Sequence, residues 1–497
     1  MILTLDFGTT HTKAAVFEAS GLCSGLVFGR SAKVLTNEPP RHEVDARSWL
    51  AALADLLAKL GIHEGTQLEA IVVSGNGPTI LPVDTDGQPL AAAMTWLDRR
   101  AVLEAAEAGN AIGNELDPAY NLPKILWIRR HEPALYERTA HFVSCPEYVA
   151  GVLTGEWHTC LPNEGYTRII WNSDAIKALG LDEGKLPPFL GIGQRAGTVT
   201  QKAARQFGLP AGVPVVMGGP DFIASLLGTA TVAPGRCCDK GGTSEGINLC
   251  TSPGFPDDRR LLVMPHVVAP LLNVSGVLST TGRAIEWCRD VLTRDDDFEG
   301  FFKRVKEVPP GARGLIFLPY LAGERSPHWD PLASGVFAGL RLDHTVSDMA
   351  RAVVESTAFA IRDILEVMKA DGAFITDLRA TGMPSRVPLW NQIKADVTGV
   401  PVIAGSFPEP ELAGCLAIGQ VALGYASSLT EAAEAVFKPA AVFEPDPALH
   451  QLYDEMFSIY REIYCRCADL FPRIRQAADP EWYGCRDATL HKEASDA

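Results

Sequence analysis

The chain has 497 residues, and at about 100–200 residues per domain this length predicts two or more domains. Apolar residues make up 47% and charged residues 21%, with 45 Gly and 35 Pro, which is typical of globular proteins and excludes disordered or collagen-like chains. The 44 Lys and Arg against 60 Asp and Glu give a net charge of −16, so we expect neither nucleic acid nor an anionic membrane as partner.

Strands and helices alternate through the first half of the chain. Apolar, β-branched runs at 1–5 and 12–18 flank the polar turn DFGTTH and predict a β-hairpin. The spacing of apolar residues predicts a helix at 49–60, and the run EAIVVSG at 69–75 predicts a buried strand. The alternation recurs between 213 and 250, so the predicted fold class is α/β.

A stretch rich in Gly, Pro and charge at 251–260 is typical of a linker. It predicts a domain over 1–250, a second over 251–450, and a C-terminal helix with an irregular tail over 451–497. The second domain alternates again, with a helix from Arg283, a long helix at 346–369 and another at 388–398; these segments are read from the same periodicity.

One pattern occurs twice, as a strand, a turn of Gly, Thr and Thr or Ser, and a second strand. The turns are Gly8-Thr9-Thr10 and Gly242-Thr243-Ser244. Glycine lets the backbone approach a ligand closely, and successive N–H groups form an anion site, so both turns are candidates to face a common polyphosphate. The alternative is that the two turns are unrelated.

The opening MILTLDFGTT lacks the charged and apolar regions of a secretory signal, and no apolar run reaches the ~18 residues of a membrane span. Eleven cysteines are scattered without a CxxC pair. We therefore expect a cytoplasmic protein with reduced thiols.

Motifs of four other enzyme classes lack their structural context or are missing. GIGQRA at 191–196 fits G-x-G-x-x-A but follows LPPFL and not a clear strand. GTSEG at 242–246 fits a nucleophile elbow, yet a strand and not a helix is predicted after it, which makes Ser244 a poor nucleophile. The sequence contains neither a P-loop nor an HExxH zinc motif.

Two aspartates are candidates for phosphate chemistry. Asp6 ends the first strand, where it can hold a hydrated Mg²⁺ while the following turn and Lys13 meet phosphate oxygens; the alternative is an ordinary hairpin whose Asp caps its own turn. Asp221 begins a helix directly after Gly218 and Gly219. It is placed either to cap that helix or to accept a proton from a hydroxyl that attacks a γ-phosphate.

These motifs resemble the FGGY carbohydrate kinases over residues 1 to about 440. DFGTTHTK is similar to the first phosphate loop of the family, TWLDRR (95–100) to its sugar-side motif and GGTS (241–244) to its second phosphate loop. GERSPHWDP and the segment 335–355 match its C-terminal motifs. The resemblance implies two duplicated ribonuclease-H-like domains of the actin and hexokinase type, with ATP and sugar in a cleft between them.

The resemblance also implies roles for individual residues. It makes Asp221 the general base and gives Asp6 the Mg²⁺, held through water. The substrate-binding residues would be Trp96, Asp98, Arg100 and Asp221, with a core aromatic as the alternative for Trp96. The ATP-binding residues would be Gly8, Thr9, Thr10, Lys13, Gly242, Thr243, Ser244, Gly282, Gly382, Met383 and Gln392.

Departures from the family pattern concern the ligands. Met383 and Pro384 stand where the family usually has glycine, which narrows the space for the nucleotide. SGNGPT at 74–79 replaces the Met-His-Gly of xylulokinases, with Pro78 at the His position, and the Arg-Glu pair of glycerol kinases is also missing there.

We expect an ATP- and Mg²⁺-dependent kinase of a small sugar or polyol, with a pentulose as the first choice. A hexulose or a glycerol-like polyol is an alternative substrate. A non-catalytic sugar or nucleotide sensor on the same scaffold is the alternative from another class, and a hydrolase built on Ser244 is more distant. Family members are often dimers, so a homodimer stays open.

Overall fold

The computed structural model describes residues 1–18, 20–242, 244–294 and 296–478. The chain forms two compact units. Unit 1 contains residues 1–232, 264–272 and 409–438; unit 2 contains 233–263, 273–408 and the chain from 439 onward. The division falls before the predicted linker, because the hairpin that starts at Arg236 pairs with a strand that starts at Asp377 and so belongs to the later unit.

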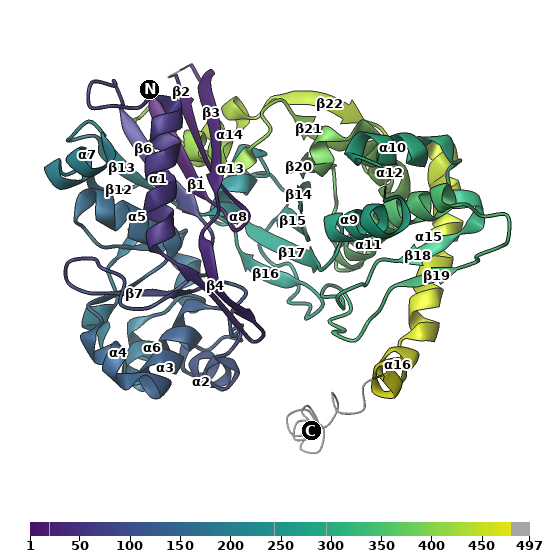
Figure 1. Ribbon diagram of the computed structural model, residues 1–497, viewed down its shortest axis with the longest axis horizontal. Helices are drawn as coiled ribbons and strands as arrows, with labels where there is room; N and C mark the ends of the chain where they lie inside the picture. The colour runs from purple at the N-terminus through teal and green to yellow at the C-terminus, as the bar shows by residue number, and fades with distance from the viewer. Residues whose placement is uncertain (19, 243, 295, 479–497) are drawn as a thin grey trace. The chain divides into compact units, whose positions relative to one another are not determined.

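Unit 1 is built on a six-stranded sheet with the order β12-β13-β6-β1-β2-β3 (Figure 1). The β1–β2 pair is the antiparallel hairpin that the sequence predicts, and β3 extends it in the same sense. On the other side β1 runs parallel to β6, which runs parallel to β13. The bounds are β1 Ile2–Phe7, β2 His11–Phe17, β3 Cys23–Arg30, β6 Ala70–Gly75, β12 Arg195–Thr198 and β13 Pro214–Pro220.

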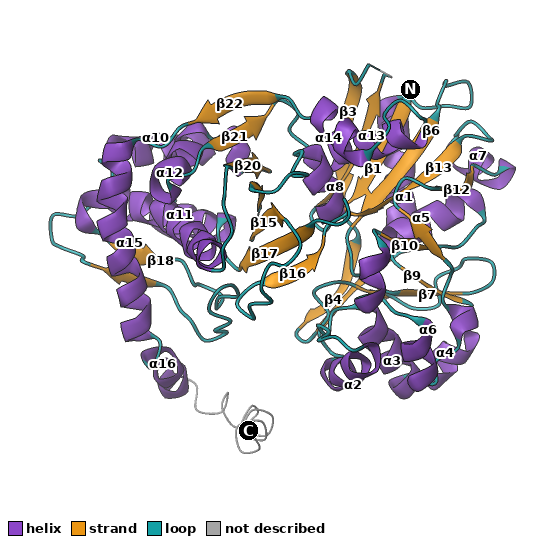
Figure 2. Cartoon of the chain, turned by 180° about the vertical axis from the view of Figure 1, so that it is seen from behind, coloured by secondary structure: helices purple, strands orange, loops and turns teal. Residues whose placement is uncertain are grey.

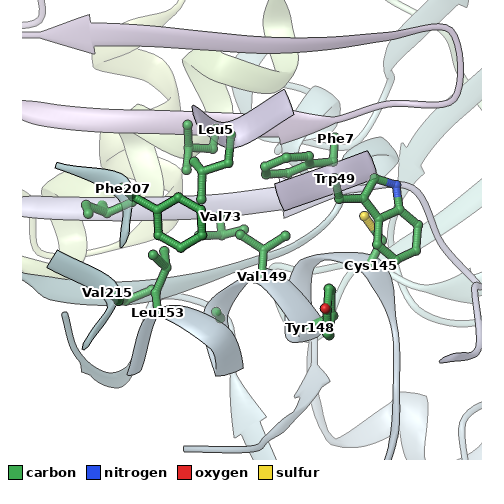
Figure 3. Packing of buried hydrophobic residues seen from close by; sticks show 14 of the residues in the cluster. Leu5, Phe7, Trp49, Val73, Cys145, Tyr148, Val149, Leu153, Phe207 and Val215 are labelled. Atoms are coloured by element: carbon green, nitrogen blue, oxygen red, sulfur yellow. The ribbon is translucent and has the colours of Figure 1, made fainter. Parts of the chain in front are cut away.

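The central strands of this sheet are buried and mostly apolar because helices cover both of their faces. Every residue of β1 and β6 is buried. On one face α1 (Arg47–Leu60) and α5 (Cys145–Thr154) contribute Trp49, Tyr148 and Val149 to the core that contains Leu5 and Val73 (Figure 3). A continuous core therefore fixes the positions at which these strands end.

On the other face, α8 (Asp221–Gly228) and α13 (Pro410–Ala422) cross at very close range. A Cβ built at Gly228 would lie 1.9 Å from the carbonyl oxygen of Pro410, and one built at Gly414 would lie 1.8 Å from that of Ala224. Only glycine allows two helix backbones to approach so closely. This crossing explains why residues 409–438, far along the chain, belong to unit 1, and it holds α8 in place through Ala224 and Gly228, in the part of the helix away from Asp221.

The rest of unit 1 forms smaller sheets and a second core around α2, α3 and α6. The bounds of its strands are β4 Lys33–Glu38, β5 Arg41–Asp45, β7 Leu81–Val83, β8 Ala93–Met94, β9 His141–Val143, β10 Thr159–Leu161 and β11 Phe189–Gly191. The bounds of its helices are α2 Val102–Ile112, α3 Asn121–His131, α4 Pro133–Arg138, α6 Ser173–Ala178, α7 Gln201–Phe207 and α14 Leu429–Val436.

Unit 2 repeats this design with a sheet of order β16-β17-β15-β14-β20-β21-β22, whose strands are drawn in orange in Figure 2. The hairpin β14–β15 is antiparallel, and β14, β20 and β21 are parallel, the same succession as β1–β2, β6 and β13. Duplicated α/β units are thus confirmed. The bounds are β14 Arg236–Gly241, β15 Glu245–Thr251, β16 Leu262–Pro265, β17 Leu272–Leu278, β20 Asp377–Thr381, β21 Val402–Gly405 and β22 Pro439–Phe443.

Long helices cover unit 2 around an aromatic core that includes Phe301, Phe359 and Trp390. The predicted helix at 346–369 is α11, which runs one residue further. The remaining bounds are α9 Gly282–Leu292, α10 Phe298–Glu307, α11 Val346–Ala370, α12 Pro388–Thr398, α15 Pro447–Cys467 and α16 Leu470–Ala478, with the small strands β18 Ile316–Leu318 and β19 Val336–Ala338. The irregular tail expected from about 478 lies outside the described residues.

Candidate functional site

The parallel strands of unit 1 end together at one edge of the sheet, and two aspartates lie there. Asp6 on β1 aligns with Ser74 on β6, and Pro220 at the end of β13 aligns with Gly75. Asp221 follows directly as the first residue of α8. Because neighbouring strands are about 4.8 Å apart, the backbones that carry Asp6 and Asp221 are about 10 Å apart, with β6 between them.

Both carboxylates act on the thiol of Cys145, the first residue of α5. Burial raises the pKa of Cys145 well above its usual value, and the charges of Asp6 and Asp221 raise it further. The two aspartates therefore face one region of unit 1. Asp6 is 1% exposed, whereas Asp221 is half-buried, so Asp221 is the more accessible of the two carboxylates.

The first predicted phosphate turn lies against the predicted sugar-side motif. A Cβ built at Gly8 would lie 2.9 Å from the carbonyl oxygen of His11, so this tight turn requires glycine. Thr9 and Thr10 are exposed, and the indole N–H of Trp96 donates to the Thr9 hydroxyl at 2.9 Å. Trp96 is only half-buried, which does not support the alternative of a core aromatic.

Lys13 on β2 is engaged by carboxylates of unit 1. Its Nζ lies 2.8 Å from Glu409, 3.2 Å from Glu411 and 3.9 Å from Asp6. Burial alone would lower the pKa of Lys13, but Glu411 and the other two carboxylates outweigh it, so the pKa is raised. Lys13 therefore keeps its positive charge, and its role toward phosphate stays a prediction because protein carboxylates already contact it.

Asp98 and Arg100, predicted to bind substrate, contact each other. Asp98 is fully buried and accepts hydrogen bonds from the Arg100 Nε and from the backbone N–H of His42, both at 2.9 Å. Arg100 also donates to Glu43 at 2.5 Å, and its guanidinium carbon lies 4.9 Å from the centroid of the Trp127 ring. This pair fixes the turn that ends the sugar-side motif, and direct contact of either residue with a sugar stays a prediction.

The segment that replaces Met-His-Gly lies beside Asp221. A Cβ built at Gly77 would lie 3.8 Å from the Cβ of Pro220, the residue before Asp221. Asn76 is buried; its Nδ2 donates to the Phe7 carbonyl at 2.9 Å, and its Oδ1 accepts from the Thr79 hydroxyl at 2.7 Å. Sequence reasoning missed Asn76, although its place directly after a buried strand is a signal that could have found it.

The second predicted phosphate turn closes the hairpin β14–β15 in unit 2. Gly242 and Ser244 are half-buried, and Thr243 lies outside the described residues. Ser244 is followed by β15 and not by a helix, which confirms that the nucleophile-elbow geometry is missing. The turn can thus offer a ligand backbone N–H groups and the Ser244 hydroxyl.

A buried charged cluster lies below this hairpin and was missed by sequence reasoning. The Nζ of Lys394 on α12 lies 2.6 Å from Asp239 on β14 and 2.5 Å from Glu245 on β15, and all three side chains are completely buried. Burial and the Asp239 charge raise the pKa of Glu245 well above its usual value, against the opposing effect of Lys394. One ammonium therefore faces two carboxyl groups in a completely buried cluster.

Packing accounts for Pro384, which together with Met383 stands where the family usually has glycine. Gly382 adopts a positive φ of 67°, and a Cβ there would lie 2.0 Å from the carbonyl oxygen of Gly241, at the end of β14. A Cβ at Gly241 would lie 2.4 Å from the Pro384 Cγ. Pro384 thus fills the space beside Gly241, at the turn end of β14, while Met383 is half-buried next to it.

The other predicted nucleotide residues are placed at the start and along one side of helices. Gly282 is the buried first residue of α9. Gln392 on α12 donates through Nε2 to Asp396 and to the Glu444 carbonyl, both at 2.8 Å. In this arrangement the Gln392 amide braces α12, and nucleotide contact by Gln392 stays a prediction.

No group of three or more His, Cys, Asp or Glu side chains that could hold a metal occurs among the described residues. A water-mediated Mg²⁺ needs no such group, because Mg²⁺ keeps several waters and binds one or two carboxylates together with substrate phosphates. No helix in the described ranges has both the length and the apolar character that a membrane crossing requires.

Comparisons with known proteins cover nearly the whole chain. The profile "FGGY family of carbohydrate kinases, N-terminal domain" matches residues 1–228, and the corresponding C-terminal domain matches 241–423. The chain is 27% identical to a xylulose kinase of Staphylococcus epidermidis, covering 93% of this chain and 96% of that one.

Solved structures match over a similar share of the chain. A xylulose kinase of Rhodospirillum rubrum is 27% identical with a TM-score of 0.81, covering 94% of this chain and 99% of its own. A ligand-bound xylulose kinase of Lactobacillus acidophilus has a TM-score of 0.85 at 22% identity, covering 95% and 99%, which supports the fold.

Proposed function

Because the chain belongs to the FGGY family of carbohydrate kinases, we propose that it transfers the γ-phosphate of ATP to a hydroxyl group of a pentulose, with Asp221 as the general base. The observation that supports this assignment most is the place of Asp221. It is half-buried at the first position of α8, at the edge where β1, β6 and β13 end. Relatives named xylulose kinases support the choice of a pentulose.

The proposed chemistry needs positioning more than covalent catalysis. In a loose phosphoryl-transfer transition state the proton leaves the attacking hydroxyl late, so a carboxylate that holds and orients that hydroxyl suffices. The close crossing of α8 and α13 at Gly228 and Gly414 holds α8, and with it the Asp221 backbone, in place. Trp96, which is bonded to Thr9, would form one side of the acceptor site.

Each of the two glycine-containing turns, taken within its own unit, can offer a phosphate group backbone N–H donors and a hydroxyl, which is how a protein of charge −16 can bind a polyanion such as ATP. We propose that Asp6 holds Mg²⁺ through water. Asp6 fits this role because its carboxylate is buried directly before the Gly8–Thr10 turn. Mg²⁺ would neutralise charge on the β- and γ-phosphates.

The test of the general base is Asp221→Asn, with sugar-stimulated ADP release as the readout. We expect turnover to fall by several orders of magnitude while ATP affinity stays nearly unchanged. The matched control is Asp174→Asn, which makes the same isosteric change at an exposed residue in the first turn of α6 and should leave turnover unchanged. Retained turnover in Asp221→Asn would contradict the assignment.

A panel of substrates identifies the sugar that is phosphorylated. The panel is needed because SGNGPT at 74–79 departs from the xylulokinase pattern. Pentuloses, hexuloses, pentitols and glycerol are compared by ADP release, and we expect the largest stimulation from a pentulose. A non-catalytic sensor would give no stimulation with any member. A hydrolase built on Ser244 is not favoured, because β15 follows that residue.

We further propose a cytoplasmic location, which the free state of buried cysteines such as Cys237 and Cys238 supports, because thiols persist in reducing compartments. Cell fractionation with an activity assay tests this location. Light scattering on the purified chain distinguishes a monomer from a homodimer.

A further inference from the structure

A fully buried lysine lies behind the proposed acceptor site. Lys124 is in the first turns of α3, and its side chain is 0% exposed. Its Nζ donates to three backbone carbonyl oxygens, those of Thr95 at 2.7 Å, Pro78 at 3.2 Å and Met94 at 3.4 Å. Burial of a lysine is costly unless each N–H finds an acceptor, so this arrangement requires all three partners.

These carbonyl groups belong to the two segments on which the acceptor site depends. Pro78 follows Gly77, whose Cβ position is 3.8 Å from Pro220, next to the proposed base. Thr95 precedes Trp96, whose indole N–H donates to the first phosphate turn. Backbone hydrogen bonds between Ile80 and Met94 also join the segments, two residues after Pro78 in the chain.

We propose that Lys124 is a positioning residue for the acceptor sugar, because its ammonium group holds the turn beside Asp221 and the turn that carries Trp96 at a fixed separation. This inference rests on the proposed sugar kinase function and deepens it. Three carbonyl oxygens match the three N–H groups of an ammonium, whereas a neutral amine has two. The group therefore acts in its charged form.

The charge of Lys124 is sensitive to its surroundings. Burial lowers the pKa of Lys124 to about 7; Asp98 and Asp117 oppose this effect, and Arg100 and Arg99 reinforce it. The ring of His42, whose own pKa burial lowers, also faces this group. As the pH rises above about 7, Lys124 loses its proton and the three-carbonyl contact weakens.

The first test is Lys124→Met, which keeps the length of the side chain and removes every donor. The acceptor kcat/KM should fall about 10- to 100-fold, as misplacement of reacting groups costs, while the KM for ATP stays within about twofold. Lys185→Met is the matched control, because Lys185 lies in the same unit and also donates to backbone carbonyl groups, those of Glu137 and Thr139. This variant should leave both constants unchanged.

Equal losses for sugar and ATP, or an equal effect of the control, would overturn the positioning role. If Lys124→Met does not fold, Lys124→Gln, which retains two N–H donors, and the pH profile of the unmodified enzyme replace it. The profile should show a constant acceptor KM below pH 7 and a rising one above it, with a flat KM for ATP. An acceptor KM that stays flat from pH 6 to 9 would overturn it.

The outcome also separates this inference from the function on which it rests. If no sugar stimulates ADP release in the unmodified enzyme, the proposed function is wrong. If stimulation occurs and Lys124→Met keeps the acceptor kcat/KM, only the role of Lys124 is wrong.

Discussion

The hairpins β1–β2 and β14–β15 occupy the same position in their sheets, but their charges are arranged differently. In unit 1, Lys13 lies on the hairpin itself with its side chain 17% exposed, near Asp6, Glu409 and Glu411. In unit 2, a helix supplies Lys394, which is completely buried with two hairpin carboxyl groups. One turn therefore has a partly solvated charge network next to it, and the other has a completely buried charge cluster below it.

This difference assigns different roles to two similar turns. Around Lys13, three carboxylates face one ammonium, so the region is negative in sum and suited to attract Mg²⁺. Around Lys394, Asp239 on β14 and Glu245 on β15 are joined by one completely buried ammonium, so this cluster stabilises the hairpin from below. We expect the first hairpin to be sensitive in catalysis and the second in stability.

The largest expected effect is on stability, in Lys394→Met. Removal of one partner of a buried ion pair costs about 3–5 kcal/mol, because the Asp239 charge is left uncompensated. Urea unfolding followed by tryptophan fluorescence reports on this change, since Trp390 lies 5.2 Å from the Lys394 ammonium. Lys13→Met is the comparison and should lower the midpoint less; a larger drop for Lys13→Met would reverse the contrast.

The next effect is catalytic, in Asp6→Asn. Loss of the carboxylate should lower kcat/KM for ATP about 100-fold and raise the Mg²⁺ concentration needed for half-maximal rate, since a metal ion supplies several kcal/mol of charge stabilisation. The thermal midpoint should change little. Asp239→Asn, at the corresponding hairpin of unit 2, should lower the midpoint and spare the Mg²⁺ dependence. Identical behaviour of the two variants would contradict the assigned roles.

A smaller effect is expected from Gly382→Ala. Gly382 has a positive φ of 67°, and an added Cβ would lie 2.0 Å from the Gly241 oxygen. An alanine there therefore requires movement of β14, at a cost of about 1–3 kcal/mol. The KM for ATP should rise, because the second turn follows Gly241. Gly8→Ala, in the hairpin turn of unit 1, is the comparison, because its Cβ position lies 2.9 Å from the His11 oxygen. A greater loss of stability in Gly8→Ala than in Gly382→Ala would be inconsistent with these contacts.

The smallest effect is the pH dependence carried by Glu245. Its pKa is raised in the folded protein, so the folded state binds a proton more tightly than the unfolded state, and stability falls as the pH rises from about 4.5 through the raised pKa. Glu245→Gln should change stability at low pH by less than about 1 kcal/mol and flatten this slope. Thermal melts from pH 4 to 8 measure both. An unchanged slope would show that Glu245 ionises normally.

Local patterns in the sequence were sufficient for both hairpins and for the helix start at Asp221. Alternating apolar runs around a glycine turn depend only on neighbouring residues, and the structure confirms the pairing of Ile2–Phe7 with His11–Phe17. Gly219 before Asp221 has a positive φ of 76°, the conformation that a sharp strand-to-helix turn needs. These signals lie within a few residues of each other.

Long-range contacts were not predictable from one sequence. The hydrogen bond between Trp96 and Thr9 joins residues 87 positions apart, and Lys394 meets Asp239 across 155 positions. The return of the chain to unit 1 depends on Gly414 meeting α8, which no local composition marks. The family resemblance of TWLDRR predicts that Asp98 and Arg100 bind substrate, and it gave no sign that the two side chains also pair with each other; their contact with a sugar stays a prediction.

The central claim is that unit 1 presents Asp221 to a sugar hydroxyl for phosphorylation by ATP. The most direct measurement is ADP release with Mg²⁺ and a pentulose, with the product identified by mass spectrometry, in the unmodified chain and in Asp221→Asn. We predict that a pentulose stimulates ADP release, that a sugar monophosphate accumulates, and that both are lost in Asp221→Asn. ADP release that is independent of every sugar, or a sugar phosphate that forms equally in Asp221→Asn, would contradict the account.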